Sequence, residues 1–236
     1  DLVLIDELVG LLDGVPTYGH VVIDEAQDLS PMQCRAIARR SVAGSVTVLG
    51  DLAQATTPWA PGDWALTLDH LGHPDATVQP LTAGYRVPGS VLDLANRLLP
   101  HIATGLQPAT SVRPGVGAVT AHRRADLVPT VRSLLAGVGS IGVIGADREV
   151  GALLGELADL GAAELTGDAD PRLAVVASRT AKGLEFDAVV VVEPAHLVGS
   201  EVDRRTGLRR LYVALTRAVS HLVLVHDSAL PVELTG

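Results

Sequence analysis

Short apolar runs alternate with amphipathic segments along most of the chain. At the start, Leu2, Ile5, Leu8, Val9 and Leu12 recur at helical spacing and predict a helix. Further helices are expected at 31–40, 63–71, 85–99, 126–136, 148–160 and 208–218. Strands are expected at 21–23, 45–49, 77–81, 118–121, 141–144, 173–177, 188–192 and 222–225. Strands that alternate with helices predict an α/β fold, in which helices flank parallel sheets on both faces.

The same pattern predicts two domains. Residues 100–117, rich in Pro, Gly and Thr, form the longest irregular connection. The break between domains is expected near Thr82–Gly84, which gives a first domain of residues 1–82 and a second domain of residues 83–236.

Two adjacent acids follow the first apolar run. The β-branched residues Val21–Ile23 suit a strand buried on both faces of a parallel sheet, and Asp24 and Glu25 come directly after it. In open α/β sheets the functional site lies beyond the carboxyl ends of the strands. Carboxylates at that edge can hold hydrated Mg²⁺ and polarise an attacking water. A solvated acidic turn is the alternative, and the complete pattern of apolar run and DEAQD favours the site.

Polar residues also follow the next predicted strand. Gln54 lies just beyond residues 45–49, where its amide can bond both a phosphate oxygen and a water. Trp59, in the following loop, can stack on a nucleobase or plug a domain interface. Arg86 stands just before a predicted helix, where it can reach a phosphate or pair with a neighbouring carboxylate.

The second domain offers further nucleotide-binding residues. Lys182 is the single lysine of the chain, and Gly183 beside it permits an unusual φ or a close approach of the backbone to a ligand. Glu185 can accept a hydrogen bond from a ribose hydroxyl. Arg217, at the end of the predicted helix 208–218, is placed as an arginine finger would be.

One expected motif does not occur in the sequence. No G-x-x-x-x-G-K-[ST] loop is present, and Ala181 before Lys182 rules that lysine out as its member. The chain therefore holds the later part of a phosphate site and lacks the loop that grips the β- and γ-phosphates.

Five segments together resemble motifs II to VI of UvrD/Rep-type superfamily 1 helicases. In chain order they are DEAQD, GDLAQ, GYR, AKGLEFD and LYVALTRA. The resemblance implies two tandem RecA-like domains of the P-loop NTPase type, the first incomplete, with ATP and Mg²⁺ in a cleft that both domains line.

The same resemblance implies that Asp24 coordinates Mg²⁺ and that Glu25 activates the water. Gln54, Arg86 and Arg217 would contact the γ-phosphate, while Lys182, Gly183 and Glu185 would line the nucleotide pocket.

The departures from these helicases concern the residues that contact DNA. Thr56 and Thr57 replace an Ile-Tyr pair, and Trp59 with Ala60 replaces an aromatic-Arg pair. We expect local nucleic-acid contacts at Trp59, Thr57, Arg179 and Thr216. About 95 residues separate Arg86 from Lys182, which leaves no room for the large inserted domain of processive helicases. This pattern is most similar to HelD-like ATPases, which bind bacterial RNA polymerase.

Composition narrows the class of protein. The 18 basic and 27 acidic residues give a net charge of −9, which argues against a general nucleic-acid coat protein. The single cysteine excludes an internal disulfide and fits a reducing compartment. The sequence shows neither a signal peptide nor a membrane-spanning run, so we expect a cytoplasmic protein without a membrane partner.

The sequence leads to one main hypothesis and two alternatives. The chain is expected to be the C-terminal ATPase portion of a HelD-like protein that remodels RNA polymerase–nucleic acid complexes. This piece alone is expected to be inactive, because the phosphate-binding loop would come from a preceding segment of the same protein. The alternatives are a UvrD-like single-strand DNA translocase in repair and a non-catalytic module that docks a partner.

Overall fold

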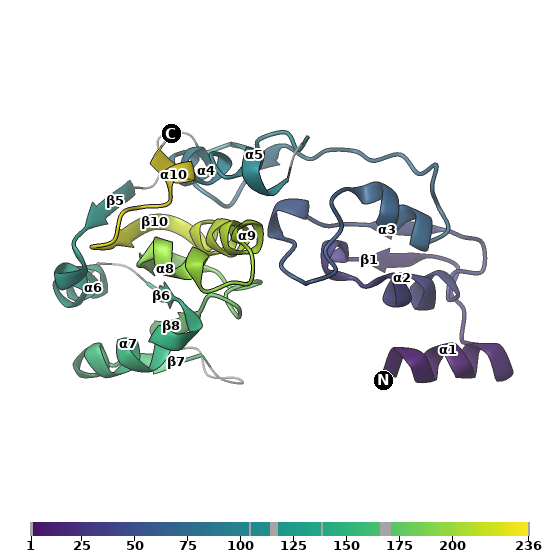
Figure 1. The fold of residues 1–236 in the computed structure, drawn as a ribbon, viewed down its shortest axis with the longest axis horizontal. Coiled ribbons are helices and arrows are strands. Elements are labelled where there is room, and N and C mark those ends of the chain that lie inside the picture. The colour runs from purple at the N-terminus through teal and green to yellow at the C-terminus, as the bar shows by residue number, and fades with distance from the viewer. Residues whose placement is uncertain (1, 104, 114–117, 138, 166–170, 236) are drawn as a thin grey trace. The chain divides into compact units, whose positions relative to one another are not determined.

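The computed structural model describes residues 2–103, 105–113, 118–137, 139–165 and 171–235. The chain forms two compact units, Asp1–Pro80 and Leu81–Gly236 (Figure 1). Among the described helices, none is both long and apolar enough to cross a membrane.

The first unit is built around two short parallel strands. Its elements are α1 (Leu2–Leu12), β1 (Val21–Ile23), η1 (Ala26–Asp28), α2 (Pro31–Ala38), β2 (Val46–Val48), η2 (Leu52–Gln54) and α3 (Trp64–His70). Strand β1 pairs with β2 so that Val21 lies opposite Val46 and Ile23 opposite Val48. The buried side chains of Ile23, Ala26, Cys34 and Leu71 form its small core.

Two expectations for this unit are wrong. Only Ile23 of β1 is buried, and Val22 is 62% exposed, so the strand is covered on one face and not on both. No strand forms at residues 77–81, where Leu81 is 84% exposed. Apolar residues there have no neighbouring strand among the described residues to pair with, and an unpaired strand is not stable in water.

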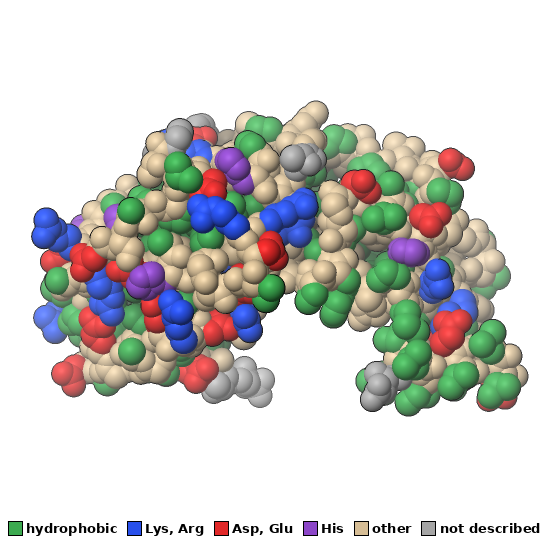
Figure 2. Space-filling model, viewed as in Figure 1, with side chains coloured by type: hydrophobic (Ala, Val, Ile, Leu, Met, Phe, Trp, Pro, Cys, Tyr) green, Lys and Arg blue, Asp and Glu red, His purple; other side chains and the backbone are tan. Residues whose placement is uncertain are grey.

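Helix α1 forms where its spacing predicts, but its apolar side chains are not packed. Its contacts with the rest of the unit include ion pairs from Asp6 and Glu7 to Arg39 and Arg40 of the α2 end. The apolar side chains gather in green over α1 in Figure 2, and Leu2, Leu8 and Leu12 are 60–82% exposed. Electrostatic contacts, and not burial, therefore hold this helix to α2.

The second unit contains a larger parallel sheet. Its helices are α4 (Gly89–Asn96), α5 (Leu99–Ile102), α6 (Leu127–Leu135), α7 (Val150–Glu156), α8 (Pro194–Gly199), α9 (Arg204–Leu215) and α10 (Val232–Thr235). Its strands are β3 (Ala83–Gly84), β4 (Thr110–Ser111), β5 (Ala118–His122), β6 (Ile141–Gly145), β7 (Ala163–Glu164), β8 (Leu173–Ala177), β9 (Phe186–Val192) and β10 (Ala218–Val225). Among the described residues, six strands form one sheet in the order β5-β10-β9-β6-β8-β7, and every pair is parallel.

Helices cover both faces of this sheet. On one face, α6 and α7 pack on apolar residues such as Val143, Val175 and Val190. On the other face, α8 packs against β6, and α9 packs against β9 and β10, with α4 and α5 beyond α9 (Figure 1). The predicted α/β class, with helices flanking a parallel sheet, is confirmed.

The connection from β8 to β9 positions much of the site. Both strands pair parallel to β6, so residues 178–185 must return from the carboxyl end of the sheet to its amino end. No helix forms in this crossover, which is described throughout. The segment AKGLEFD consequently reaches the amino end of β9 as an open loop.

Candidate functional site

The acid pair lies at the carboxyl end of β1, as the sequence predicts. Both Asp24 and Glu25 are exposed, and the N–H of Glu25 donates to Asp24 Oδ1 at 2.8 Å. The backbone of Glu25 is left-handed, with φ 54° and ψ 33°, a conformation that is uncommon for a residue with a side chain. Such backbone strain is found at functional sites, where surrounding contacts hold it.

A chain of hydrogen bonds links Glu25 to Gln54. Gln27 Nε2 donates to Glu25 Oε2 at 2.5 Å, and Gln27 Oε1 accepts from the N–H of Asp51 at 3.0 Å. Asp51 Oδ2 then accepts from Gln54 Nε2 at 2.8 Å. The polar residues after β1 and β2 are therefore brought together at one sheet edge, as the sequence predicts.

The loop that follows η2 is tied to the same edge. Trp59 Nε1 donates to the carbonyl of Asp28 at 2.8 Å, and the N–H of Thr56 donates to Asp28 Oδ1 at 3.2 Å. With its N–H anchored, Trp59 still exposes 51% of its surface. The hydroxyl of Thr57 is enclosed and has no hydrogen-bond partner among the described residues. The nucleic-acid role of both residues stays a prediction.

The acids suit a magnesium ion that is shared with a ligand. Within the described part of the chain, no three His, Cys, Asp or Glu side chains form a metal-binding group. Magnesium in nucleotide sites takes only one or two carboxylates and completes its shell with water and phosphate oxygens. The exposed carboxylate of Asp24 fits that requirement.

In the second unit, Arg86 pairs with Glu185. The guanidinium Nη1 of Arg86 donates to Glu185 Oε1, which is the alternative that the sequence left open for this arginine. Arg86 Nε is enclosed and has no partner among the residues described. Arg113 Nη1 donates to the carbonyls of Arg86 and Val219, at 2.9 and 3.0 Å, and so fixes the backbone that carries Arg86.

Arg217 is buried, although the sequence places it at an open helix end. Helix α9 ends at Leu215, and Arg217 lies in the link to β10 with 3% of its surface exposed. Its Nε donates to the carbonyl of Val213 at 3.0 Å and its Nη1 to the carbonyl of Leu184 at 3.3 Å.

Thr216 is also 3% exposed, and its hydroxyl donates to the carbonyl of Tyr212 at 2.9 Å. This burial does not favour a nucleic-acid contact at Thr216.

The predicted nucleotide-binding residues of the second unit gather at the amino ends of β9 and β10. Glu185 directly precedes β9, Arg217 directly precedes β10, and the N–H of Phe186 donates to the carbonyl of Arg217 at 3.1 Å. Lys182 and Gly183 lie in the loop just before them. These residues lie at the amino ends of the strands because the helix-free crossover from β8 carries the motif back across the sheet.

Gly183 is needed for its backbone conformation. Its φ is +81°, and a Cβ built there would meet no atom within 4 Å. Of the two reasons that the sequence allowed for this glycine, the structure therefore supports the unusual φ.

Arg179 belongs to an ion-pair network at the opposite end of the sheet. Its Nε lies 3.1 Å from Glu201 Oε1 and 3.1 Å from Asp147 Oδ2. Hydrogen bonding to Glu201, with the charges of Glu201 and Asp147, raises the pKa of the Arg179 guanidinium. The predicted nucleic-acid contact of Arg179 would have to compete with these carboxylates.

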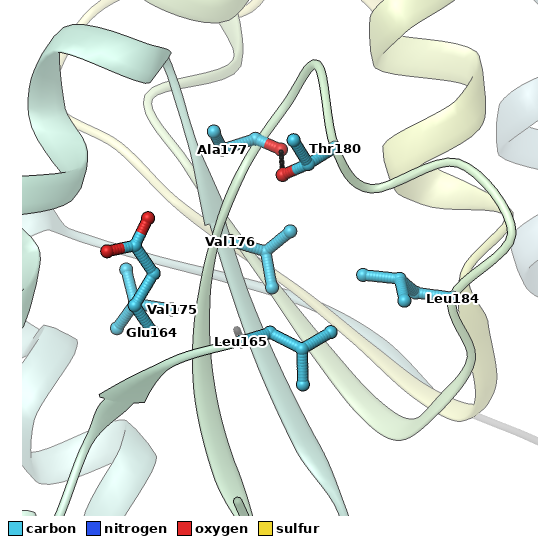
Figure 3. Close-up of a pocket in the computed structure, with 7 residues that line it drawn as sticks. All are labelled: Glu164, Leu165, Val175, Val176, Ala177, Thr180 and Leu184. Carbon is cyan, nitrogen blue, oxygen red and sulfur yellow. Dashed lines mark hydrogen bonds between the residues drawn. The ribbon is translucent and has the colours of Figure 1, made fainter. Parts of the chain in front are cut away.

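A small pocket lies beside the crossover loop (Figure 3). Its volume is about 120 Å³, and its lining is Glu164, Leu165, Val175, Val176, Ala177, Thr180 and Leu184. None of the residues predicted to bind nucleotide lines it. Ligand pockets usually measure about 300–1,000 Å³, so a nucleotide does not fit here.

Sequence reasoning assigned no role to Gln27, Asp51 or Arg113. Burial of a polar side chain between two loops is not readable from the sequence. A weak signal for Gln27 did exist, because a glycine at the end of a strand often marks the close approach of another group. Gly50 is such a glycine, and a Cβ there would lie 2.4 Å from Gln27 Oε1.

Three solved structures that are similar to this chain are helicases or a domain of a possible helicase. Arterivirus nonstructural protein 10 (helicase) has a TM-score of 0.52 at 21% identity, over 89% of this chain and 40% of that one. The C-terminal domain of a possible DNA helicase from Lactobacillus plantarum WCFS1 has a TM-score of 0.49 at 22% identity, over 64% of this chain and 92% of that one. The PRRSV helicase has a TM-score of 0.48 at 17% identity, over 87% of this chain and 34% of that one. The likeness to the arterivirus protein concerns the fold, and this chain spans less than half of that protein.

Comparison with curated proteins gives no significant match. A family profile does match the second unit, over the segment that contains Arg179, Lys182, Glu185 and Arg217. Residues 173–225 of this chain are similar to the UvrD-like helicase C-terminal domain.

Proposed function

We propose that this chain is part of an ATP-driven motor of the UvrD-like helicase type. The observation that carries the proposal is the hydrogen-bonded chain from Glu25 to Gln54 at the carboxyl end of β1 and β2. These hydrogen bonds hold the exposed carboxylate of Glu25, whose backbone is strained, and connect it to Gln54. An enzyme that activates a water beside a phosphate requires such a fixed carboxylate.

The roles follow from the chemistry of each side chain. Glu25 accepts a proton from the attacking water, and Gln54 orients that water against the γ-phosphate of ATP. Arg86 and Arg217 supply positive charge for phosphate oxygens. Glu185 accepts from a ribose hydroxyl, and Lys182 and Gly183 lie next to it in the same loop.

The first unit also offers a carboxylate for a magnesium ion. Asp24 would hold it, and the bound ion would neutralise charge on the phosphate oxygens. The 236 residues contain no G-x-x-x-x-G-K-[ST] loop. We propose that a preceding segment of the same protein supplies this loop, so that the 236 residues alone do not turn over ATP.

The first experiment measures Mg²⁺-dependent ATP hydrolysis by the full-length protein. Glu25→Gln keeps the shape of the side chain but removes the base, so we expect kcat to fall by about 100-fold or more. Glu164→Gln, the same change at an exposed position, is the control and keeps full turnover. Hydrolysis that survives Glu25→Gln would contradict the proposal, and turnover by the 236-residue chain would contradict the need for the preceding segment.

For the partner, we propose bacterial RNA polymerase in complex with nucleic acid. The proposal rests on the likeness of residues 18–33, YGHVVIDEAQDLSPMQ, to HelD-like proteins and on the loss of the usual DNA-contacting pairs at residues 56–60. Release of labelled RNA from a stalled polymerase complex should require ATP and should stop in Glu25→Gln. Unchanged release in Glu25→Gln would favour the non-catalytic docking module instead.

Trp59 supports a single-strand DNA translocase as the second candidate. Its indole N–H is anchored to Asp28 while half of its surface stays exposed, which leaves the ring free to stack on a base. This candidate predicts salt-sensitive binding of single-stranded DNA that weakens in Trp59→Ala. The net charge of −9 weighs against it.

A further inference from the structure

Gln27 is a buried side chain between the two loops that follow β1 and β2. It is 0% exposed, and both ends of its amide are bonded, Nε2 to Glu25 Oε2 and Oε1 to the N–H of Asp51. A carboxylate can only accept and a backbone N–H can only donate, so the orientation of the amide is determined by its partners. Turning the amide over would break both hydrogen bonds.

The structure provides a fitted space for this amide. A Cβ on Gly50 would lie 2.4 Å from Gln27 Oε1 and 2.7 Å from the Trp64 ring. Gly50 therefore leaves room that the Gln27 side chain fills. Gln27 can neither withdraw into solvent nor exchange its partners for water without opening this packing.

Glu25 depends on such a support. Its side chain is exposed and its backbone is left-handed, so neither packing nor secondary structure alone fixes its carboxylate. An exposed Glu side chain samples several rotamers. The hydrogen bond from Gln27 selects one of them, relative to Asp51 and hence to Gln54.

We propose that Gln27 is the positioning residue that aims the Glu25 carboxylate for ATP hydrolysis. This inference rests on the proposed function. Gln27 touches no substrate and acts through Glu25 and through the backbone of Asp51. Misplacing a reacting group by about 1 Å can lower a rate by about 100-fold, so the loss of this contact is expected to lower kcat and to leave nucleotide binding in place.

The test uses two variants of the full-length protein and one matched control. Gln27→Met keeps the approximate volume and removes both hydrogen bonds. Gln27→Glu keeps an acceptor for the N–H of Asp51 and replaces the donor to Glu25 with a carboxylate that repels it. Gln33→Met makes the same change at the capping box of α2, where Gln33 Oε1 accepts from the N–H of Ser30. We expect kcat to fall by about 10- to 100-fold in both Gln27 variants, with KM for ATP changed less than about 3-fold, while Gln33→Met keeps kcat.

A second measurement separates positioning from a structural role. If Gln27 acts through Glu25, Gln27→Met added to Glu25→Gln should lower the residual turnover no further. The inference would be overturned if the losses of kcat in the two single variants add in the double variant. It would also be overturned if kcat falls equally in Gln33→Met or stays unchanged in Gln27→Glu. If Gln27→Met fails to fold, Gln27→Glu decides alone. Absence of turnover in the wild-type protein would instead overturn the proposed function.

Discussion

Arg86 and Glu185 form an ion pair within the second unit, although the resemblance to helicases implies that both side chains contact a nucleotide. Their side chains are 39% and 50% exposed. Ion pairs this exposed contribute only about 0.2–1 kcal/mol to stability. The pair therefore adds little to the fold, and Arg86 can exchange the carboxylate for a phosphate, which accepts hydrogen bonds from a guanidinium equally well.

Replacement of Arg86 should affect turnover and not folding. We expect Arg86→Ala to lower kcat for ATP by about 1,000-fold, as the loss of an arginine that stabilises a transferring phosphate does. The melting temperature should stay within about 2 °C of wild type, because the lost pair is exposed. Parallel thermal denaturation and steady-state kinetics check both expectations. A large fall in melting temperature would show that Arg86 serves the fold.

Gly207 should be intolerant of a larger side chain, since it lies where α9 meets α8. A Cβ there would stand 2.2 Å from the carbonyl oxygen of Val198, which is backbone and cannot rotate away. Gly207→Ala should destabilise the protein by about 1–3 kcal/mol, because the two helices must separate. Gly155→Ala in α7 is the matched control, with nothing within 4 Å of its Cβ, and should be neutral or slightly stabilising. Equal stability of the two variants in urea denaturation would contradict this close packing.

Glu193 should make the stability depend on pH in the acid range. It is 6% exposed; burial alone would raise its pKa, but hydrogen bonds from Asp227 and Ser228 outweigh burial and hold the pKa below its usual value. A lowered pKa in the folded state gives stability that is present above the unfolded value of about 4.3 and is lost as pH falls through the folded value. Melting curves between pH 7 and pH 3 should therefore fall more steeply for wild type than for Glu193→Gln.

The control for this pH dependence is Glu164→Gln, at an exposed residue. It should keep the wild-type slope of melting temperature against pH. If Glu193→Gln loses stability with acid as steeply as wild type does, then other carboxylates, such as Glu156 beside Arg124, determine the acid range.

The sheet of the second unit was predictable because its strands are apolar runs with clear boundaries. Residues 173–177 form β8 as predicted, and β6 differs from the prediction only by the addition of Gly145.

Helix α8 was not predicted, because six residues are too few to show a helical period. Helix α9 begins at Arg204, four residues earlier than predicted, and its signal was the N-cap Asp203, whose side chain accepts from the N–H of Thr206.

The candidate site was predictable only as a set of chemical groups. The sequence places Asp24, Glu25 and Gln54 after apolar strands, and the structure brings the last two into one hydrogen-bonded chain. The sequence does not identify Glu185 as the partner of Arg86. It also does not predict that Arg217 is buried. Both depend on the path of the crossover from β8 to β9, which sequence periodicity does not specify.

Arg217 differs from Arg86 in burial, and the difference predicts a different response to substitution. Its guanidinium donates to the carbonyls of Val213 and Leu184, and so joins the end of α9 to the loop before β9. Arg217→Ala leaves those carbonyls without this donor, so we expect it to lower the free energy of unfolding by about 1–3 kcal/mol and to reduce turnover as well. Urea denaturation alongside ATP hydrolysis checks this. If Arg217→Ala is as stable as wild type but inactive, these carbonyl contacts do not support the fold, and Arg217 acts as the arginine finger that the sequence predicts.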